Sequence, residues 1–171
     1  MKGKTASETH IQDHTYKVFP NDLNSKGTAF GGMIMSQLDR LAAVVAERHS
    51  GQTCVTVSVD SMHFLAPAHR GDHLIFKVSM NHAWRTSMEI GAKVIAEDPR
   101  TGERRHMVSV YFTFVAIDDN EKPTPVPPLI CETRDEKRRS QEAQIRRERR
   151  KAEAEETKER RSSQIDTEPE K

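Results

Sequence analysis

The chain has few cysteines and lacks any apolar run long enough to cross a membrane. Its two cysteines, Cys54 and Cys131, form neither a disulfide framework nor a CxxC metal pair, which fits a reducing compartment. A membrane-spanning helix needs about 20 consecutive apolar residues, and no segment approaches that length. The N-terminal stretch MKGKTASETHIQD also lacks the apolar centre of a signal peptide. We therefore expect a cytoplasmic protein that does not enter a membrane.

An excess of charge of one sign is missing as well. The 27 basic and 26 acidic residues nearly cancel, which gives no electrostatic case for a partner that is a nucleic acid. The charges are unevenly placed, because residues 132–171 hold 13 of the basic and 12 of the acidic residues, leaving 14 of each in residues 1–131. The body of the protein is thus balanced and fairly apolar, and the tail accounts for the low mean hydropathy of -0.76.

The first part of the chain predicts one strand, one loop and one helix. Residues 14–19 read as a short strand, and residues 20–32 are rich in Asn, Gly and Ser, as is typical of a loop. Residues 33–49 carry apolar side chains at helical spacing, and Gly51 is a plausible helix stop. Because this helix is apolar over much of its circumference, we expect it to be mostly buried; the apolar positions are Ile34, Leu38, Leu41, Ala42 and Val45.

Four alternating segments then predict an antiparallel meander. Apolar residues alternate along residues 53–66, 73–82, 86–97 and 104–117, with tight turns between the later segments. The alternation changes phase within the first of them, which predicts a β-bulge near Asp60–Ser61. One apolar sheet face needs a cover, and only one helix is available to provide it. The pattern therefore favours an α+β hotdog fold, a curved antiparallel sheet wrapped around one long central helix.

The domain organisation follows from the same pattern. We expect a flexible N-terminus over residues 1–13, a hotdog domain over residues 14–130, and a charged tail over residues 131–171 that is helical or partly disordered. Residues 123–130 are Pro-rich and extended, and should run over the surface. The tail lacks a sustained heptad, so a solvated, partly frayed helix from Arg134 to about Arg161 without chemistry is expected.

Asp39 is the most unusual side chain of the predicted helix. Its helical neighbours include Met35, Ala42 and Ala43, so it lies beside the apolar face. A buried carboxylate costs several kcal/mol unless it is paired, and such surroundings suit a general base that works near neutral pH. The alternative is an ion pair with Arg40, Arg48 or a residue of the sheet, and the residues alone do not separate the two.

Two further features lie just before this helix. Gly31 and Gly32 leave backbone N–H groups at a helix N-terminus that can bind an oxyanion, although a plain turn could need the same glycines. Asn24 is either a functional amide or an ordinary loop residue. The eight histidines are scattered, and no spacing among them resembles a metal site, so no metal is predicted.

Several motifs resemble those of a known family. The run from Pro20 to Gly32, followed by Met35–Asp39, is similar to acyl-CoA thioesterases of the bacterial YciA type and to the brain-type cytosolic acyl-CoA hydrolases of mammals. The likeness covers roughly residues 14–130 and leaves the tail outside. It continues, in the same order and with similar spacing, through residues 55–60, 64–67, 71–72, 85–89 and 114–116.

This resemblance implies an acyl-CoA thioester hydrolase that needs no cofactor, since CoA is part of its substrate and product. It implies Asp39 as the catalytic carboxylate, acting as base or nucleophile, and Asn24 as its catalytic partner from the opposite subunit. The Gly32 N–H, beside Gly31, becomes the oxyanion donor. The implied assembly is a homo-oligomer, at least a dimer and commonly a hexamer built as a trimer of dimers. The segment implied to line the substrate channel is Arg85, Thr86 and Ser87.

Two alternatives belong to the same fold. Hotdog domains also occur as non-catalytic acyl-CoA sensors, but the DNA-binding module of regulators would not fit in the 13 residues before the first strand. A hydratase needs a well-placed histidine, and His49 lies at the far end of the helix from Gly32, roughly 25 Å away at the usual rise.

A further hypothesis places Arg146, Arg147 and Arg149 at the phosphates of CoA. The role of Trp84, where many relatives have a small residue, stays open between channel and surface packing.

Overall fold

A computed structural model describes residues 1–165 of the chain. Within these residues the chain forms two α-helices, five strands that make up one sheet, and two very short strands, β1 and β7, that pair with each other. The elements are β1 (Lys4–Thr5), β2 (Ile11–Lys17), a 3-10 turn (Pro20–Asp22), α1 (Gly31–Ser50), β3 (Thr53–Val59), β4 (His73–Ala83), β5 (Ser87–Glu97), β6 (Arg104–Ile117), β7 (Leu129–Ile130) and α2 (Arg134–Ile165).

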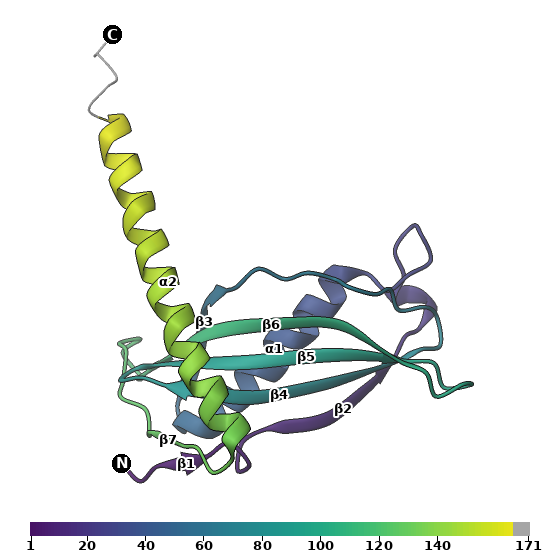
Figure 1. The fold of residues 1–171 in the computed structure, drawn as a ribbon, viewed down its shortest axis with the longest axis horizontal. Helices are drawn as coiled ribbons and strands as arrows, with labels where there is room; N and C mark the ends of the chain where they lie inside the picture. Colours follow the sequence, from purple (N-terminus) through teal and green to yellow (C-terminus); the bar gives the residue numbers. More distant parts are fainter. Residues whose placement is uncertain (166–171) are drawn as a thin grey trace.

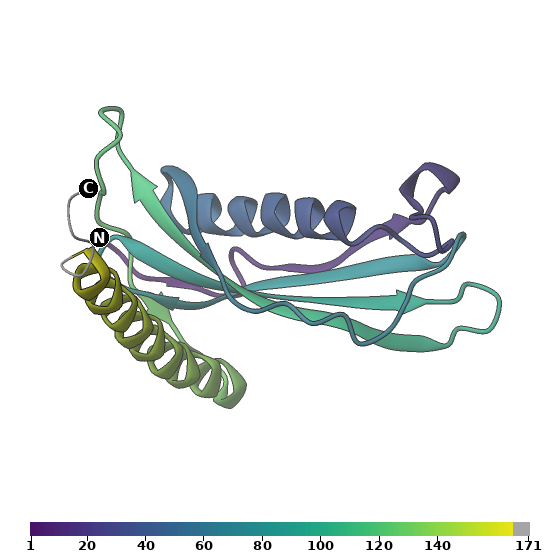
Figure 2. The same ribbon diagram turned by 90° about the horizontal axis from the view of Figure 1, so that it is seen from above.

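Five strands form one antiparallel sheet in the order β2-β4-β5-β6-β3. Helix α1 lies along one face of this sheet, and α2 crosses the opposite face (Figures 1 and 2). The α+β hotdog architecture expected from the sequence is confirmed. Gly51 follows α1 with a φ of 71°, a left-handed conformation that glycine adopts without strain, so the expected helix stop is also confirmed.

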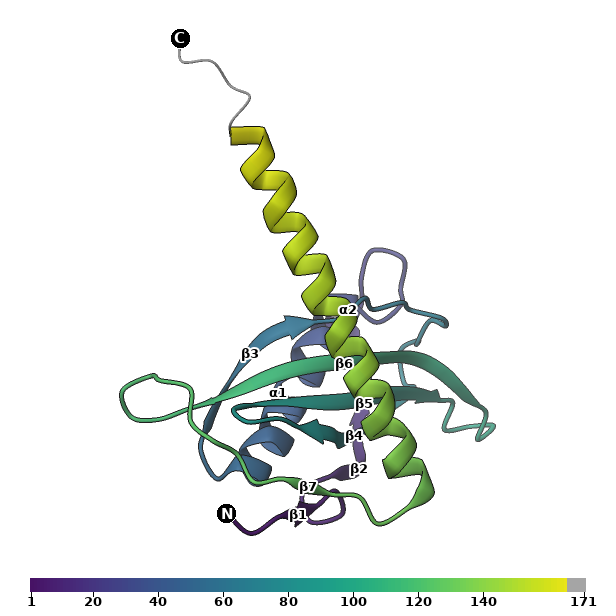
Figure 3. The same ribbon diagram turned by 60° about the vertical axis from the view of Figure 1, so that its left-hand side comes forward.

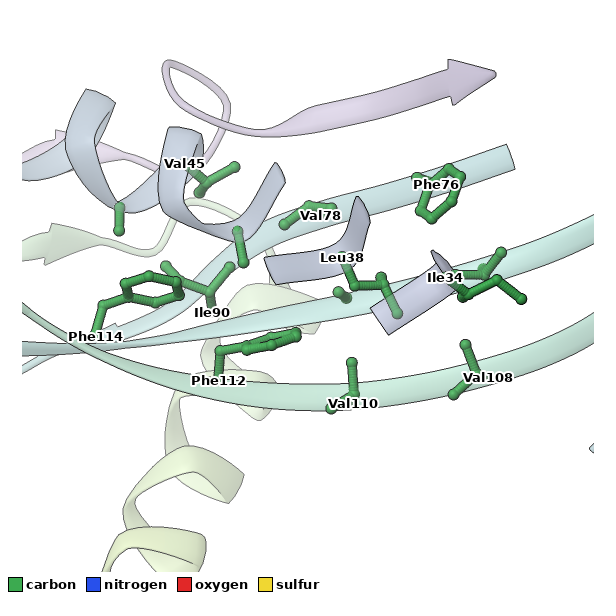
Figure 4. Close-up of a cluster of buried hydrophobic side chains, with 14 of the residues drawn as sticks. Ile34, Leu38, Val45, Phe76, Val78, Ile90, Val108, Val110, Phe112 and Phe114 are labelled. Carbon is green, nitrogen blue, oxygen red and sulfur yellow. The ribbon is translucent and has the colours of Figure 1, made fainter. Parts of the chain in front are cut away.

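The core lies between α1 and the sheet (Figure 4). Ile34, Leu38 and Val45 of α1 are 0% exposed and pack among side chains of the three central strands, including Phe112 and Phe114. Burying side chains of this size contributes about 1.5–3 kcal/mol each relative to leaving them in water. Alternate residues along β4, β5 and β6 supply the sheet side of this core, as the period-two pattern predicts.

The irregularity of β3 differs from the expected one. The strand ends at Val59, and its register against β6 shifts between Thr56 and Ser58, earlier than the bulge predicted at Asp60–Ser61. The segment after Val59 still follows β6, because the Asp60 N–H donates to Tyr111 O at 3.0 Å and Leu65 N–H to Met107 O at 2.8 Å. These two hydrogen bonds explain why strand-like alternation continues beyond the end of the strand.

The N-terminus is more ordered than expected. Residues 1–13 were predicted to be flexible, yet β1 pairs in parallel with β7 and β2 begins at Ile11. Ala6 and Thr9 are 1% and 2% exposed, so this segment packs on the domain. The sequence pattern missed the pairing because two-residue strands carry no periodicity, and their partner lies more than a hundred residues away.

Helix α2 is not simply a solvated tail. Ala143 is 0% exposed, and Arg146 and Arg150 reach Glu89 on β5, which is also 0% exposed, through contacts of 2.6 and 2.9 Å. Arg150 additionally contacts Asp60 at 2.8 Å. The first half of α2 is thus packed on the sheet, while the second half extends beyond it (Figure 3). Residues 166–171 of the predicted tail lie outside the described residues.

Candidate active site

The loop that leads into α1 is held in place by Asp22. Its carboxylate accepts hydrogen bonds from the Tyr16 hydroxyl at 2.9 Å and from the Phe19 N–H at 2.7 Å, and its backbone oxygen accepts the Phe30 N–H at 2.7 Å. The hydrogen bond to this carboxylate raises the pKa of Tyr16 above its ordinary value. These contacts position both Asn24 and the start of the helix.

Asn24 lies at the exposed tip of this loop. Its side-chain oxygen accepts the Lys26 N–H at 2.9 Å, and its amide nitrogen donates to the Thr28 hydroxyl at 2.9 Å. Gly27 completes the turn with a φ of 75°. Asn24 therefore closes its own loop, as the ordinary reading of a loop asparagine predicts. In the described chain it makes no hydrogen bond to Asp39.

Helix α1 begins at Gly31 with free backbone donors. Phe30 O accepts the N–H groups of Met33 and Ile34, whereas those of Gly31 and Gly32 find no acceptor within residues 1–165. Neither glycine has a positive φ, so they are not required by the turn angles. Instead, a Cβ on Gly32 would lie 2.5 Å from the ring of Phe30. The glycine permits this close approach and leaves donors that, with the helix dipole, favour an anion.

Asp39 contacts Thr56 on the edge strand β3. The Thr56 hydroxyl donates to Asp39 Oδ1 at 2.7 Å, which joins the middle of α1 to the sheet edge. Asp39 is half-buried in the single chain, and among residues 1–165 it makes no ion pair with Arg40 or Arg48. The structural alternative predicted for Asp39 thus does not occur with these arginines. The carboxylate keeps a free oxygen beside an oriented hydroxyl.

Gly31, Met35 and Asp39 follow one another at intervals of four residues and form one row on the helix. Met35 is 46% exposed at the middle of this row, although the helix was expected to be mostly buried. Large apolar side chains are exposed around the beginning of the row as well, with Phe30 at 57% and Phe64 at 44%. The row therefore lies on a side of α1 that its own sheet leaves partly uncovered, next to the exposed row of Ser36, Arg40 and Val44.

The predicted site residues are not all brought together within one chain. Asp39 and Gly32 are seven residues apart on α1, about 10 Å along its axis at 1.5 Å per residue. Arg85, Thr86 and Ser87 lie at the β4–β5 turn, where the Arg85 and Thr86 carbonyls accept the N–H groups of Val126 and Ala116. Arg85 is exposed there, on a strand connection separated from β3 by β6.

The structure decides the role of Trp84 and of two tail arginines. The Trp84 ring lies 4.7 Å from that of His82 and 4.3 Å from the guanidinium of Arg147, so it packs against α2. Arg146 lies over the Tyr111 ring at 3.7 Å besides its contact with Glu89. Both arginines are occupied by side chains of the protein, which leaves the hypothesis of phosphate contacts without support at these positions.

Sequence reasoning missed Thr56 as a separate candidate. A signal was present, since Thr56 is a hydroxyl residue between the apolar positions Val55 and Val57. The signal could not be read without knowing that β3 is an edge strand next to Asp39. Within the described part of the chain, no three His, Cys, Asp or Glu side chains are placed to hold a metal ion. No helix there is long and apolar enough to span a membrane.

Comparison with known proteins identifies the family. Residues 26–103 match the Thioesterase superfamily. The chain is 42% identical to the acyl-CoA thioester hydrolase YkhA of Bacillus subtilis, over 71% of this chain and 71% of that protein. It is 36% identical to the cytosolic acyl coenzyme A thioester hydrolase of Rattus norvegicus over 75% of this chain, but this covers only 34% of the rat protein.

Solved structures agree over almost the whole chain. An acyl-CoA hydrolase from Bacillus cereus has a TM-score of 0.87 at 39% identity, covering 94% of this chain and 98% of that one. The acyl-CoA hydrolase of Staphylococcus aureus, solved with butyryl coenzyme A and coenzyme A, has a TM-score of 0.85 at 36% identity and covers 95% and 98%. A hexameric acyl-CoA thioesterase has a TM-score of 0.86 at 36% identity, covering 90% and 98%.

The Staphylococcus aureus hydrolase has also been solved in three variants. In these an aspartate, an asparagine or a threonine is replaced by alanine, and each variant is at least 35% identical to this chain. Sequence identity and structural agreement of this extent lead to one family, the one that the sequence motifs predicted. This chain belongs to the hotdog-fold thioesterase superfamily and is an acyl-CoA thioester hydrolase.

Proposed function

We propose that Asp39 is the catalytic carboxylate of this hydrolase and that Thr56 orients it. The observation that carries the proposal is the 2.7 Å hydrogen bond from the Thr56 hydroxyl to Asp39 Oδ1. One carboxylate oxygen is held by this donor, and the other stays free to receive a proton. A carboxylate with one oriented oxygen is well placed to act on a water or on a carbonyl carbon.

The spacing of three residues supports this assignment. In the Staphylococcus aureus hydrolase, the aspartate chosen for replacement lies 15 positions after the asparagine and 17 before the threonine. In this chain Asp39 lies 15 positions after Asn24 and 17 before Thr56. A match of both intervals in a protein of the same fold supports equivalent roles for the three residues.

Two copies of the chain are needed to complete this site. Groups that act on one thioester carbonyl must lie within about 3 Å of the reacting atoms. On a single α1, the Gly32 N–H and Asp39 are about 10 Å apart along the axis. Two α1 helices placed antiparallel by a twofold axis near Met35 would bring the Gly32 of one copy opposite the Asp39 of the other. We infer that Asn24 and Gly32 of one subunit act with Asp39 and Thr56 of its partner.

The surface for this pairing is already apolar. Strand β3 is an edge of the sheet, and Val55, Val57 and Val59 on it are 41%, 60% and 45% exposed. Exposed edge strands with apolar side chains invite pairing with another strand. A twofold axis beside β3 would extend the sheet into a second copy and place the two α1 helices side by side. Such dimers are the proposed units of a hexamer, the assembly of related thioesterases.

The reaction follows from these positions. Asp39 removes a proton from a water molecule while the oxygen of this water bonds to the thioester carbon. Negative charge then develops on the carbonyl oxygen, and a hydrogen bond from the Gly32 N–H stabilises it. Asn24 orients the water or the substrate. Collapse of this intermediate breaks the carbon–sulfur bond, and the thiolate of CoA takes up the proton. The products are a carboxylic acid and CoA, and no cofactor takes part.

Arg85, Thr86 and Ser87 are proposed to contact the substrate, since the β4–β5 turn is partly exposed near the end of the sheet. A cytoplasmic location is proposed from the cytosolic acyl coenzyme A thioester hydrolases among the relatives. Asp39 as a nucleophile, forming an anhydride with the acyl group, is the chemical alternative to the base.

The test is thiol release from a series of acyl-CoAs, short to long, by wild type, Asp39→Ala and Asp39→Asn. Loss of about 10²–10⁴ in kcat with the fold intact is expected for both variants. Equal turnover in wild type and variants would refute the role of Asp39. A single turnover in ¹⁸O-water then tests for the anhydride, because label in the Asp39 side chain requires it. Label in the acid product alone fits direct attack or attack of water on the acyl carbon of an anhydride, and trapping with hydroxylamine, which converts an anhydride to an acyl hydroxamate, separates these two.

A further inference from the structure

The last part of α2 extends past the edge of its own sheet. We name residues 151–165 the overhang, because the last contacts of α2 to the sheet are those of Arg150 with Asp60 and Glu89. At 1.5 Å per residue the overhang is about 22 Å long, several times the 4.8 Å that separates neighbouring strands. Figures 1 and 3 show it projecting beyond β3, the edge strand of the sheet.

Over residues 151–162, the overhang makes no packing contact of its own that would explain its presence. Its residues up to Ser162 are all exposed, and its sequence is polar around the whole helix. A helix that is polar on every side either bridges between bodies or depends on pairs of charges along its surface. Such pairs are present, for example Arg160 with Glu156 at 2.6 Å, but they lie along the helix and do not attach it to the sheet.

A groove separates the overhang from the end of β3. It has a volume of about 940 Å³ and lies between residues 58–61 and the face of α2 that carries Arg149, Lys158 and Arg161. In the described chain none of these three cations makes an ion pair. Among the described residues, the helical wall of the groove is thus mainly basic, with Glu153 as its one carboxylate, and the opposite wall includes Val59, one of the exposed valines of β3.

We propose that the overhang docks on a second copy of this chain, whose sheet continues across β3 and enters this groove. The proposal rests on the subunit pairing proposed above, and extends it to an element outside the catalytic domain. If β3 pairs with β3 of a partner, the next strands of the continued sheet must lie beneath the overhang. By the twofold symmetry, the partner's overhang then covers the first sheet in the same way.

The charges fit this occupant better than an apolar one. A partner surface that meets Arg149, Lys158 and Arg161 must supply carboxylates or backbone oxygens to offset three cations that have no ion-pair partner within residues 1–165. Residues 1–131 carry 14 acidic residues, of which Asp22, Asp72 and Glu89 are buried, so a second copy offers the other eleven as carboxylates at its surface. A reversed charge at such a contact would meet a like charge of the partner, and this repulsion weakens association strongly.

The first test reverses two of these charges. Lys158→Glu combined with Arg161→Glu changes the wall of the groove, and Lys151→Glu combined with Arg160→Glu makes the same charge change in the same helix outside the groove. Sedimentation over a dilution series measures the dissociation of the oligomer. We expect dissociation constants raised at least about tenfold for the groove variant and within about threefold of wild type for the control, in line with the effect of charge pairs at interfaces. Equal constants for both variants would overturn the proposal.

The second test follows the backbone of the overhang by hydrogen exchange. Val57→Asp places a charge on the exposed edge of β3 and should separate the subunits while each remains folded. Amides of residues 151–162 should be protected in the wild-type oligomer and should exchange at least about tenfold faster in Val57→Asp. Fast exchange in an intact wild-type oligomer would overturn the docking but leave the proposed catalytic pairing in place. A wild-type monomer at all concentrations would overturn both.

Discussion

Arg146 of α2 contacts Glu89 of β5 at 2.6 Å, although the two residues are 57 positions apart in the chain. The Glu89 carboxylate is 0% exposed, and it also receives Arg150 at 2.9 Å and the Asn81 amide at 3.1 Å. A carboxylate so deeply buried is tolerable only because two guanidinium groups and an amide surround it. The helix that provides them is therefore part of the folded domain.

The buried carboxylate can be tested by Glu89→Ala. This change leaves Arg146 and Arg150 of α2 without the carboxylate that they share. Removing one member of a buried ion pair typically costs about 3–5 kcal/mol. We expect a loss of this size in the free energy of unfolding, measured with urea. Glu155→Gln, at an exposed position of the same helix, should change stability by less than about 0.5 kcal/mol. Similar losses for both variants would contradict the account of α2.

The orienting hydroxyl can be tested by Thr56→Ala and Thr56→Ser. Hydrogen bonds to charged groups contribute about 1.5–3 kcal/mol, so Thr56→Ala should lower kcat/KM by about 10- to 100-fold. Thr56→Ser keeps the hydroxyl and should retain most of the activity. Ser58→Ala, two residues further along the same strand, is the control. A Thr56→Ala enzyme with wild-type kinetics would show that Asp39 needs no orientation.

The division of the site between subunits can be tested by mixing two inactive variants. Asn24→Ala and Asp39→Ala each lack one member of every site in their own homodimers. In a mixed dimer, one site receives both mutations and the other is fully wild type, provided that the two residues come from opposite subunits. When equal amounts of the two variants exchange subunits at random, about half of the dimers are mixed, and one of the two sites in each mixed dimer is wild type. We therefore expect about a quarter of the wild-type turnover to return. Absence of any recovery, with exchange verified, would place both residues in one subunit.

The glycine at the start of α1 can be tested together with Phe30. A Cβ added at Gly32 would lie 2.5 Å from the Phe30 ring, so Gly32→Ala must displace this ring or the backbone. A shift of the N–H by about 1 Å is expected to reduce kcat by up to about 10². Adding Phe30→Ala removes the collision and should restore much of the loss. A double variant as impaired as Gly32→Ala alone would show that the ring is not the cause.

His49 predicts how stability depends on pH. It is 0% exposed, its Nε2–H donates to Pro127 O at 2.8 Å, and its Nδ1 has no partner among the described residues. Burial lowers the pKa of His49 in the folded protein. The unfolded chain titrates near the ordinary value of about 6.5, so below this pH the unfolded state binds the proton more readily. The neutral ring of His49 therefore makes its full contribution to the stability of the folded protein above pH 6.5. This contribution is lost as the pH falls toward the lowered pKa of His49 in the folded protein.

Urea unfolding at pH 7, 6 and 5 checks this expectation. The wild type should lose stability over this range more steeply than His49→Gln, which keeps a side-chain donor for Pro127 but has no titrating ring. Parallel pH profiles of the two proteins would mean that His49 is protonated without cost in the folded state.

The order of elements could be predicted from the sequence because period-two and period-3.6 patterns act within each segment. Side-chain alternation and local spacing can be counted directly in the sequence. They predict the helix around Leu38, the meander from His73 to Ile117 and the family motifs around Asp39. The same local signals predicted the stop at Gly51. For this reason the sequence alone predicts the hotdog architecture and the candidate carboxylate.

Only the tertiary structure decided the contacts between segments far apart in the chain. Thr56 donates a hydrogen bond to Asp39, two arginines of α2 contact Glu89, and β1 pairs with β7. In each case the partners are neighbours in space that share no periodicity in the sequence. The tail looked solvated because its charges alternate, and their partners lie on strands that come much earlier in the sequence. A charge pattern reports which side chains can pair, but the free energy of burial determines which pairs form.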